Sequence, residues 1–288
     1  MRALVIGGTG FIGSSIVRRL SAGGHAVAIF HRGKTRAGQL QAREFLDPSS
    51  TLPIQKFPKE LFEFDPEIVV HTFAMGAADA DAAVRAFAGR IQRIVLLSSG
   101  DVYRAYGRFT GLEPGPIEPG LLSEESPLRS VHFPYRSQAA SPDSLQYWYE
   151  KILAEQAVMQ GDIPWTVLRL PKVYGRGNNA NLATVYAYRN HPSWRWTHGY
   201  VENVADAVVL AATSPAAANR VYNVGEADTP TVAERLPWMP VSAVQSSNEK
   251  FNFEQDIAYD TSRVRNELGY CEVIPEREAM LRTLEVMS

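Results

Sequence analysis

The hydrophobic residues of this 288-residue chain gather in short runs that alternate with amphipathic segments. Short continuous apolar runs are typical of strands buried on both faces of a parallel sheet, whereas apolar residues spaced three and four apart are typical of helices. The predicted strands are Ala3–Ile6, His25–Phe30, Ala42–Leu46, Ile68–Phe73, Ile91–Leu97, Trp165–Leu170 and Arg220–Val224.

Helical patterns follow most of these strands. The alternation of strands and helices predicts an α/β fold with a Rossmann-type doubly wound parallel sheet. A stretch rich in Gly, Pro, Arg and Ser, residues 104–140, predicts a long loop, which compact domains usually keep for function. The predicted helices are residues 12–20, Ala77–Ala88, Pro142–Gln160, Ala205–Ala212, Ser262–Leu268 and Arg277–Val286.

Composition narrows the class of protein. With 45% hydrophobic residues the chain can bury a full core, and a net charge of -2 gives no reason to expect nucleic-acid or anionic-membrane binding. One cysteine, Cys271, excludes an internal disulfide framework. No apolar run approaches the ~20 residues of a membrane span, and the first strand leaves no room for a signal peptide. We therefore expect a cytoplasmic protein.

The link between the first strand and the first helix contains a glycine-rich turn. Gly7, Gly10 and Gly13 have the spacing G-x-x-G-x-x-G. Without Cβ atoms, the backbone can turn sharply and approach a pyrophosphate, which the N-terminus of the following helix attracts. The alternative is a glycine-rich turn without a ligand, but the position between strand and helix favours dinucleotide binding. The candidate cofactor-binding residues here are Gly7, Thr9, Gly10, Phe11, Ile12 and Gly13.

The residues after the second strand bear on the choice of dinucleotide. NAD sites place a carboxylate there, about 20 residues after the glycines, to bind the ribose 2′-hydroxyl. This chain has His31 and Arg32, with Lys34 and Arg36 close behind. A guanidinium can clamp a 2′-phosphate, so we predict NADP(H) rather than NAD(H), against the alternative of an ordinary solvated basic loop. We expect Asp47, after the third strand, near the adenine.

Candidate catalytic groups follow the fifth strand and lie on the next predicted helix. Ser98 and Ser99 come at the carboxyl end of a strand, where ligands bind in doubly wound sheets. Tyr147 and Lys151 are four residues apart, which places them on one face of the predicted helix. A neighbouring ammonium and a nicotinamide cation would both favour the phenolate form of the tyrosine. The alternative is an amphipathic helix with two long surface side chains.

In combination, these motifs resemble the extended short-chain dehydrogenase/reductase superfamily, in its NAD(P)-dependent epimerase/dehydratase group. The resemblance runs almost from end to end. It rests on Gly7-Gly-Thr-Gly-Phe-Ile-Gly13, Leu97-Ser-Ser-Gly-Asp-Val-Tyr103, Tyr147-x-x-x-Lys151, Leu168-Arg-Leu-Pro-Lys-Val-Tyr-Gly175, Tyr200-Val-Glu-Asn-Val-Ala205 and Val221-Tyr-Asn-Val-Gly225.

The resemblance implies two domains and a catalytic triad. Residues 1–175 and 198–225 would form an NADP-binding Rossmann domain, with residues 176–197 and 226–288 as a smaller carboxyl-terminal substrate-binding domain. Ser99 would polarise the substrate oxygen, Tyr147 would act as the general base, and Lys151 would bind the nicotinamide ribose and lower the pKa of Tyr147. Family members also form dimers through two helices per subunit, which here are Ala77–Ala88 and Pro142–Gln160.

The chain also departs from its relatives. Lys172 stands where members that bind sugar nucleotides have an Asn that touches the substrate. Gly100 and Asp101 alter the Thr-Asp-Glu-Val-Tyr pattern of sugar 4,6-dehydratases, which argues against a full dehydratase mechanism. Asn178 and Asn179 are polar groups suited to a substrate, although asparagines are also common in loops. Asp101, Lys172, Asn178 and Asn179 are the candidate substrate-binding residues, and no metal site is expected.

Two functions remain open at this point. The first is an NADP-dependent oxidoreductase or epimerase that transfers hydride at a secondary alcohol or ketone of a small molecule such as a sugar derivative. The second is a non-catalytic NADP-bound sensor, or an RNA- or protein-binding member of the same fold, because fold does not fix function. The presence together of Ser99, Tyr147 and Lys151 favours the enzyme.

Overall fold

The computed structural model describes residues 1–35, 38–176, 180–239, 241 and 244–284. The chain divides into two compact units. The first comprises Met1–Ser99, His132–Leu168 and Ala205–Val221, and the second comprises Gly100–Val131, Arg169–Val204 and Tyr222–Ser288. This division differs from the expected domains, because residues 100–131, 169–175, 198–204 and 222–225 lie in the second unit.

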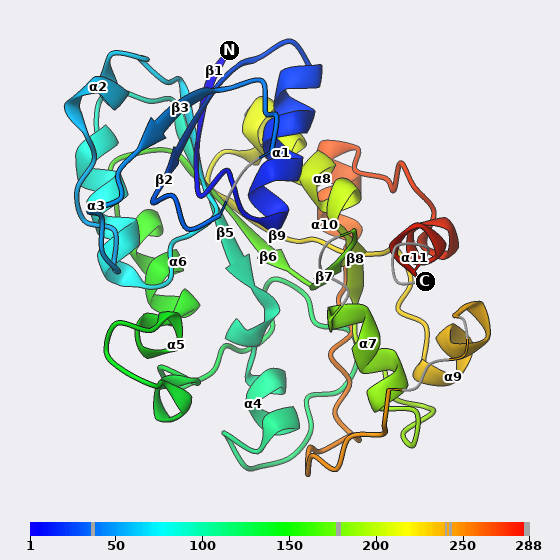
Figure 1. The fold of residues 1–288 in the computed structure, drawn as a ribbon. Coiled ribbons are helices and arrows are strands. Elements are labelled where there is room, and N and C mark those ends of the chain that lie inside the picture. Colours follow the sequence, from blue (N-terminus) through cyan, green and yellow to red (C-terminus); the bar gives the residue numbers. More distant parts are fainter. Residues whose placement is uncertain (36–37, 177–179, 240, 242–243, 285–288) are drawn as a thin grey trace. The chain divides into compact units, whose positions relative to one another are not determined.

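A seven-stranded sheet forms the largest sheet of the described residues (Figure 1), with its strands in the order β3-β2-β1-β4-β5-β6-β9. The parallel register pairs Val5 with both Ile29 and Val70, so β1 lies between β2 and β4. The strand order reverses between β1 and β4, which is where ligands bind in sheets of this kind. The strands are β1 (Arg2–Ile6), β2 (Ala26–His31), β3 (Arg43–Leu46), β4 (Ile68–His71), β5 (Arg93–Ser99), β6 (Trp165–Leu170) and β9 (Arg220–Asn223).

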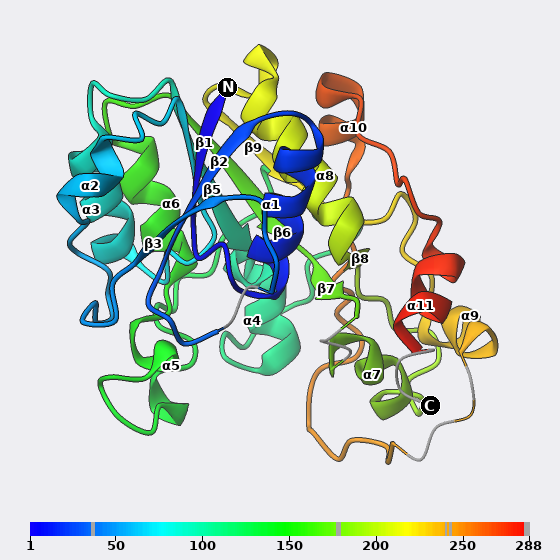
Figure 2. The same cartoon turned by 45° about the horizontal axis from the view of Figure 1, so that its top comes forward.

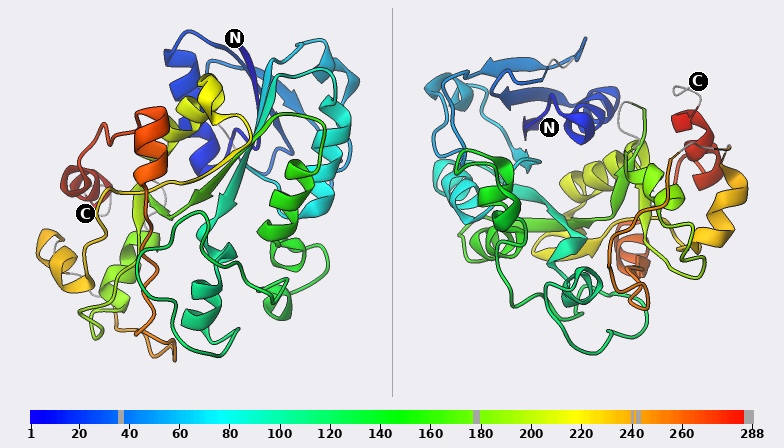
Figure 3. Two further views of the ribbon diagram at one scale, coloured as in Figure 1. Left: turned by 180° about the vertical axis from the view of Figure 1, so that it is seen from behind. Right: turned by 60° about the horizontal axis from the view of Figure 1, so that its bottom comes forward.

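Helices cover both faces of this sheet in the first unit. Figure 1 and Figure 2 show α1 (Phe11–Ala22) beside α8 (Val201–Thr213), and Figure 3 shows α3 (Ala77–Phe87) and α6 (Lys151–Met159) together on the opposite face. An ion pair between Arg19 and Asp206 joins α1 to the part of α8 in this unit. The core between the sheet and the α3–α6 layer includes Leu4, Ile6, Phe30, Val69, Phe87, Ile94, Leu96, Ala154 and Val158.

The strand predictions and the fold class are confirmed, but two segments were predicted wrongly. The expected loop over residues 104–140 contains the helix α4 (Arg104–Thr110). The expected helix over residues 142–160 is broken into α5 (Leu145–Trp148) and α6, which begins at Lys151. The break lies at Glu150, whose backbone is extended and whose side chain accepts a hydrogen bond from the backbone N–H of Ile152 as the N-cap of α6.

The second unit has a small parallel pair of strands and several short helices. Aromatic rings form much of its core, with Phe109 stacked on Trp194 at 4.8 Å and Phe251 at 4.6 Å from Phe109. Arg235 is 1% exposed and binds two carboxylates, Glu226 and Glu276. The elements are β7 (Lys172–Tyr174), β8 (His198–Tyr200), α4, α7 (Ala180–Ala187), α9 (Val232–Arg235), α10 (Ser262–Leu268) and α11 (Glu276–Leu284).

Candidate functional site

The glycine turn closes through a direct approach of backbone to backbone. Gly7 has φ +85°, a conformation that favours glycine, and a Cβ atom on Gly13 would lie 2.2 Å from the carbonyl oxygen of Gly7. Gly10 is the N-cap of α1, with no capping side chain and no acidic residue in the first helical turn. The first N–H groups of α1 and its positive dipole end are therefore available to an anion.

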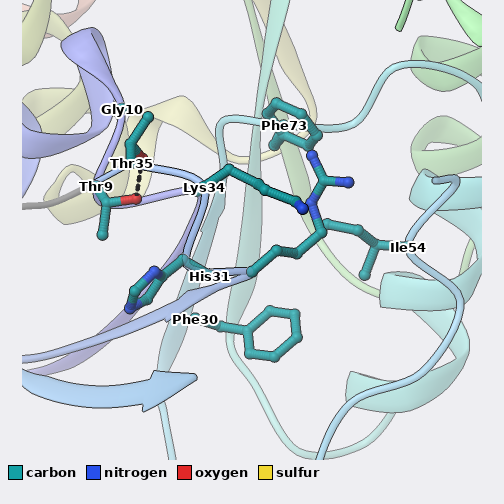
Figure 4. Close-up of a pocket in the computed structure, with 10 residues that line it drawn as sticks. Thr9, Gly10, Phe30, His31, Lys34, Thr35, Ile54 and Phe73 are labelled. Carbon is teal, nitrogen blue, oxygen red and sulfur yellow. Dashed lines mark hydrogen bonds between the residues drawn. The ribbon is translucent and has the colours of Figure 1, made fainter. Parts of the chain in front are cut away.

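A pocket lies between this turn and the loop that follows β2. Thr9 and Thr35 close one side of it, with their hydroxyl oxygens 2.6 Å apart (Figure 4). The guanidinium carbon of Arg32 lies 5.1 Å from the centre of the Phe73 ring. The pocket is lined by Gly7, Thr9, Gly10, Phe30, His31, Arg32, Lys34, Thr35, Ile54 and Phe73.

His31 lines the pocket, but both of its ring nitrogens have partners in the protein. Its Nε2 lies 2.5 Å from a carboxylate oxygen of Glu44, and its Nδ1 accepts a hydrogen bond of 3.2 Å from the N–H of Gly33. In Figure 4 the imidazole and the side chain of Lys34 point in different directions. His31 therefore orders the loop between Arg32 and Lys34. Among the described residues, no carboxylate forms an ion pair with either of these two cations.

Asp47 lies outside the pocket lining. Its carboxylate accepts hydrogen bonds from the N–H and the hydroxyl of Ser49, at 3.0 and 2.5 Å, and so caps the turn after β3. The pocket also has apolar lining residues that the sequence analysis did not predict, and Ile54 is one of them. The N–H of Ile54 donates to the buried carboxylate of Asp79 at 2.6 Å, a contact between residues far apart in the sequence. Arg36, also expected here, lies outside the described residues.

The two serines at the end of β5 have different surroundings. Ser98 is buried, and its hydroxyl donates to the buried carboxylate of Glu155 on α6 at 2.5 Å. Ser99 is only partly buried. Because successive side chains of a strand point to opposite faces, Ser98 ties β5 to α6 while Ser99 projects to the other side. Ser99 therefore stays a predicted catalytic hydroxyl, whereas the hydroxyl of Ser98 is engaged by Glu155.

Lys151 is anchored at the ends of two neighbouring strands. It is 4% exposed, and its Nζ donates to the carbonyl oxygens of Ala74 and Leu97 at 2.6 and 3.1 Å. Tyr147 and Lys151 do not share a helix, because Glu150 ends the helical conformation between them. The expected placement on one helix face is therefore wrong. The aromatic ring that lies over the Lys151 ammonium is that of Tyr149, with its centre 5.6 Å from Nζ.

His71, at the end of β4, is fully buried near this lysine. Burial lowers the pKa of His71 to about 3, and the positive charge of Lys151 contributes to the lowering. The imidazole is therefore neutral at physiological pH. Burial also raises the pKa of Asp79, whereas the backbone N–H groups it accepts from and the Lys151 ammonium lower it.

Two candidate substrate residues, Asp101 and Lys172, lie in the second unit. Asp101 is buried in the 3-10 turn Gly100–Val102. A Cβ at Gly100 would lie 1.3 Å from the hydroxyl oxygen of Tyr259, so an acidic side chain does not fit at this position. Lys172 has its ammonium 3.9 Å from the centre of the Trp196 ring, and burial lowers its pKa to about 8.

The expected substrate residues near position 178, a metal site and a membrane span remain to be compared with the described residues. Asn178 and Asn179 lie outside the described residues. No group of three or more metal-ligating side chains occurs in the part of the chain that the structure describes. Within that same part, no helix has the length and apolar character needed to cross a lipid bilayer.

The strand order and the glycine turn define a Rossmann-type α/β fold with a pocket beside the turn. Residues 3–88 match the model of the NAD dependent epimerase/dehydratase family. This stretch contains the glycine turn, the basic loop and His71 at the end of β4. The predicted resemblance to this family of NAD(P)-dependent epimerase/dehydratase enzymes is thus confirmed, with the matched sequence pattern in the nucleotide-binding part of the chain.

Solved structures extend the likeness in fold to the whole chain. Pal from Bacillus thuringiensis is 19% identical, with a TM-score of 0.73 over 100% of this chain and 99% of that one. UDP-glucose 4-epimerase from Thermotoga maritima, solved with UDP-glucose, is 18% identical, with a TM-score of 0.70 over 100% and 98% of the two chains. UDP-glucose 4-epimerase from Thermus thermophilus, in complex with NAD, is 20% identical, with a TM-score of 0.67 over 99% of this chain and 98% of that one.

At these identities the likeness shows the fold alone, and it agrees with the predicted α/β class. A comparison with curated proteins found no match.

Gly13→Ala should destabilise the protein even without a ligand. Its new Cβ would overlap the backbone oxygen of Gly7, which cannot move without distorting the turn. We expect a loss of about 1–3 kcal/mol in the free energy of unfolding, measured by urea denaturation. Gly10→Ala is the matched control, because a Cβ there meets only the Gly7 oxygen at 3.6 Å. Equal stability of the two variants would contradict this account.

The buried neutral His71 should make stability depend on pH. Its pKa is depressed in the folded state, so the unfolded chain takes up the proton first as pH falls. The stability that results from keeping His71 neutral is fully present above about pH 6.5. It is lost progressively as the pH falls toward 3. Between pH 7 and pH 5, His71→Leu should remove about 2 kcal/mol of this pH dependence in urea denaturation. A variant with the slope of the parent protein would exclude His71 as the source.

Proposed function

We propose that this protein is an NADP(H)-dependent oxidoreductase or epimerase that transfers hydride at a secondary alcohol or ketone, with a sugar derivative as the favoured substrate class. The observation that carries the proposal is the pocket in which the glycine turn and the cations of Arg32 and Lys34 lie together. The family match over residues 3–88 supports a nicotinamide dinucleotide as the cofactor. Structures of similar fold contain NAD or UDP-glucose.

The pocket fits the adenosine half of a dinucleotide. The Gly13 contact keeps the N-terminus of α1 close to β1, where its N–H groups can bind the pyrophosphate. Arg32 and Lys34 would hold the ribose 2′-phosphate, because neither forms an ion pair with a carboxylate among the described residues, although Asp79 interacts electrostatically with Arg32. Phe73 and Ile54 offer apolar surfaces to the adenine. When bound, the cofactor supplies or accepts the hydride.

The remaining chemistry falls to the chain's own residues. Ser99 would donate a hydrogen bond to the substrate oxygen, as a preorganised donor does for a developing charge. Lys151 would hold the nicotinamide ribose and favour the phenolate of a neighbouring tyrosine. Tyr147 is the tyrosine that the family resemblance assigns to this role.

We also propose a homodimer through α3 and the segment 145–159, which light scattering during gel filtration can test.

Cofactor selectivity tests the proposal directly. In fluorescence titrations, the parent protein should bind NADPH more tightly than NADH. Arg32→Gln and Lys34→Met should each weaken NADPH binding by about 10- to 100-fold and leave NADH binding unchanged, because each removes a charge-assisted contact to the 2′-phosphate.

Arg43→Gln and Lys59→Met are the matched controls, since both parent residues are exposed and lie outside the pocket lining. Equal affinities of the parent protein for NADPH and NADH would remove the NADP assignment and leave the glycine-turn site intact.

The two serines of β5 test for catalysis. Ser99→Ala should lower turnover by about 100-fold or more with NADPH binding unchanged, because it removes a donor to the reacting oxygen. Ser98→Ala is the control: it should reduce stability, through loss of the bond to Glu155, and should spare turnover. The measurement is oxidation of NADPH against a panel of ketones and keto-sugars. Tight NADPH binding without turnover on any substrate would favour a non-catalytic sensor.

A further inference from the structure

The four-residue spacing of Tyr147 and Lys151 does not place them on one helix face in this structure, because they belong to different helices. Two residues between them, Tyr149 and Glu150, are extended, with ψ of 109° and 90°. In an extended segment, residues two apart lie on the same side. This geometry places Tyr149 with Lys151. We infer that Tyr149, rather than Tyr147, is the phenol that exchanges a proton beside Lys151, an inference that rests on the proposed function.

The helix break is fixed by a buried carboxylate. Glu150 has no exposed surface, and its side chain accepts hydrogen bonds from the N–H groups of Ile152 and Phe133 at 3.0 and 2.5 Å. Its own N–H donates to the carbonyl oxygen of Met75 at 2.7 Å. Since three backbone groups from three segments converge on this residue, continuing the helix through it would leave several buried polar groups unpaired.

Tyr149 lies where a proton-transfer group would be useful. The Lys151 ammonium beneath its ring is bound to the carbonyl oxygens of Ala74, in the loop after β4, and of Leu97, two residues before Ser99. The other neighbour of the Tyr149 ring is Tyr135, at 5.1 Å in an edge-to-face arrangement. Tyr149 is partly buried, so its position is defined and still reachable from solvent.

Tyr147 belongs to a different group of side chains. Its ring centre is 4.7 Å from the guanidinium carbon of Arg136, and its carbonyl oxygen accepts a hydrogen bond of 3.1 Å from Arg136 Nε. The same guanidinium carbon lies 3.4 Å from the centre of the Phe133 ring. Tyr147 thus helps to stack the segment from residue 133 to 148, a role that its ring performs without its hydroxyl.

The charges around Lys151 come from several elements. Asp79 on α3 and His71 on β4 both interact electrostatically with the ammonium, and the imidazole is neutral. On the lysine's own segment, Glu150 is buried, with the ring Nδ1 of His132 at 3.5 Å from its carboxylate. The carboxylate of Asp79 favours the charged ammonium, which in turn favours a phenolate on the tyrosine whose ring lies over it.

The proposed step is a balanced proton and hydride exchange. In the oxidative direction, the Tyr149 phenolate would take the proton of the substrate hydroxyl, and the substrate carbon that bears this hydroxyl would release a hydride, for which a bound oxidised nicotinamide dinucleotide would be the acceptor. The C–H and O–H bonds break, a C=O bond forms, and the phenol is left protonated. Reduction of a ketone runs the same exchange in reverse.

Titration of the tyrosines in the cofactor-free protein tests the assignment without a substrate. Phenolate absorbance near 295 nm is followed against pH for the parent, Tyr149→Phe and Tyr147→Phe. The difference curve for Tyr149 should have a midpoint about 1–3 pH units below that for Tyr147. Lys151→Met should raise the Tyr149 midpoint and leave that of Tyr147 in place. A Tyr149 midpoint equal to or above that of Tyr147 would overturn the inference.

Turnover separates this inference from the proposed function. On any substrate found in the NADPH panel, Tyr149→Phe should lose about 100-fold or more in rate, and Tyr147→Phe should stay close to the parent. Loss of activity in Tyr147→Phe alone would refute the inference and leave the enzyme proposal standing. A low Tyr149 midpoint with no turnover on any substrate would refute the enzyme proposal alone. Both variants keep their rings, and equal thermal melting confirms that they fold.

Discussion

The contact between the backbones of Gly7 and Gly13 is the constraint on which the packing of α1 against the seven-stranded sheet depends. It lets α1 start directly at the end of β1, because a side chain at residue 13 would collide with the Gly7 carbonyl oxygen 2.2 Å away. A Cβ at Gly7 would likewise meet the Thr72 hydroxyl at 2.4 Å. The same packing that places the helix over the sheet thus brings its N-terminus to the pocket that contains Arg32 and Lys34.

The sequence was sufficient to predict this part of the fold because its determinants are local. Apolar runs such as Val69 and its neighbours are buried on both faces of the sheet, and the glycine spacing marks the turn between β1 and α1. The pocket was only partly predictable. Ile54 is placed by a hydrogen bond to Asp79, 25 residues away, and lies in a segment without a regular hydrophobic pattern. His31 was predicted as a cofactor-binding residue, and its pairing with Glu44 was not foreseen because Glu44 lies on another strand, where no local pattern marks the contact.

The broken helix shows a different limit of sequence patterns. Residues 142–160 read as a continuous helix because none of the residues from 145 onward is a strong helix breaker. What interrupts the helix is the burial of Glu150, which is stabilised by the N–H of Phe133 and the carbonyl oxygen of Met75. These partners come from remote parts of the chain, so the local preference for helix is overridden by tertiary hydrogen bonds that no periodicity reveals.

The buried polar groups at the ends of β4 and β5 also bear on function. Asp79, Glu150 and Glu155 are each almost fully buried, and each carboxylate accepts hydrogen bonds from the backbone or from Ser98. Burying such groups contributes little net stability compared with apolar residues of the same size. Stability alone therefore gives a poor reason for burying these carboxylates and for placing Asp79 and a neutral His71 where they interact with the Lys151 ammonium. Such an arrangement is better suited to hold a charge and a nearby phenol in fixed positions, which general acid–base catalysis requires.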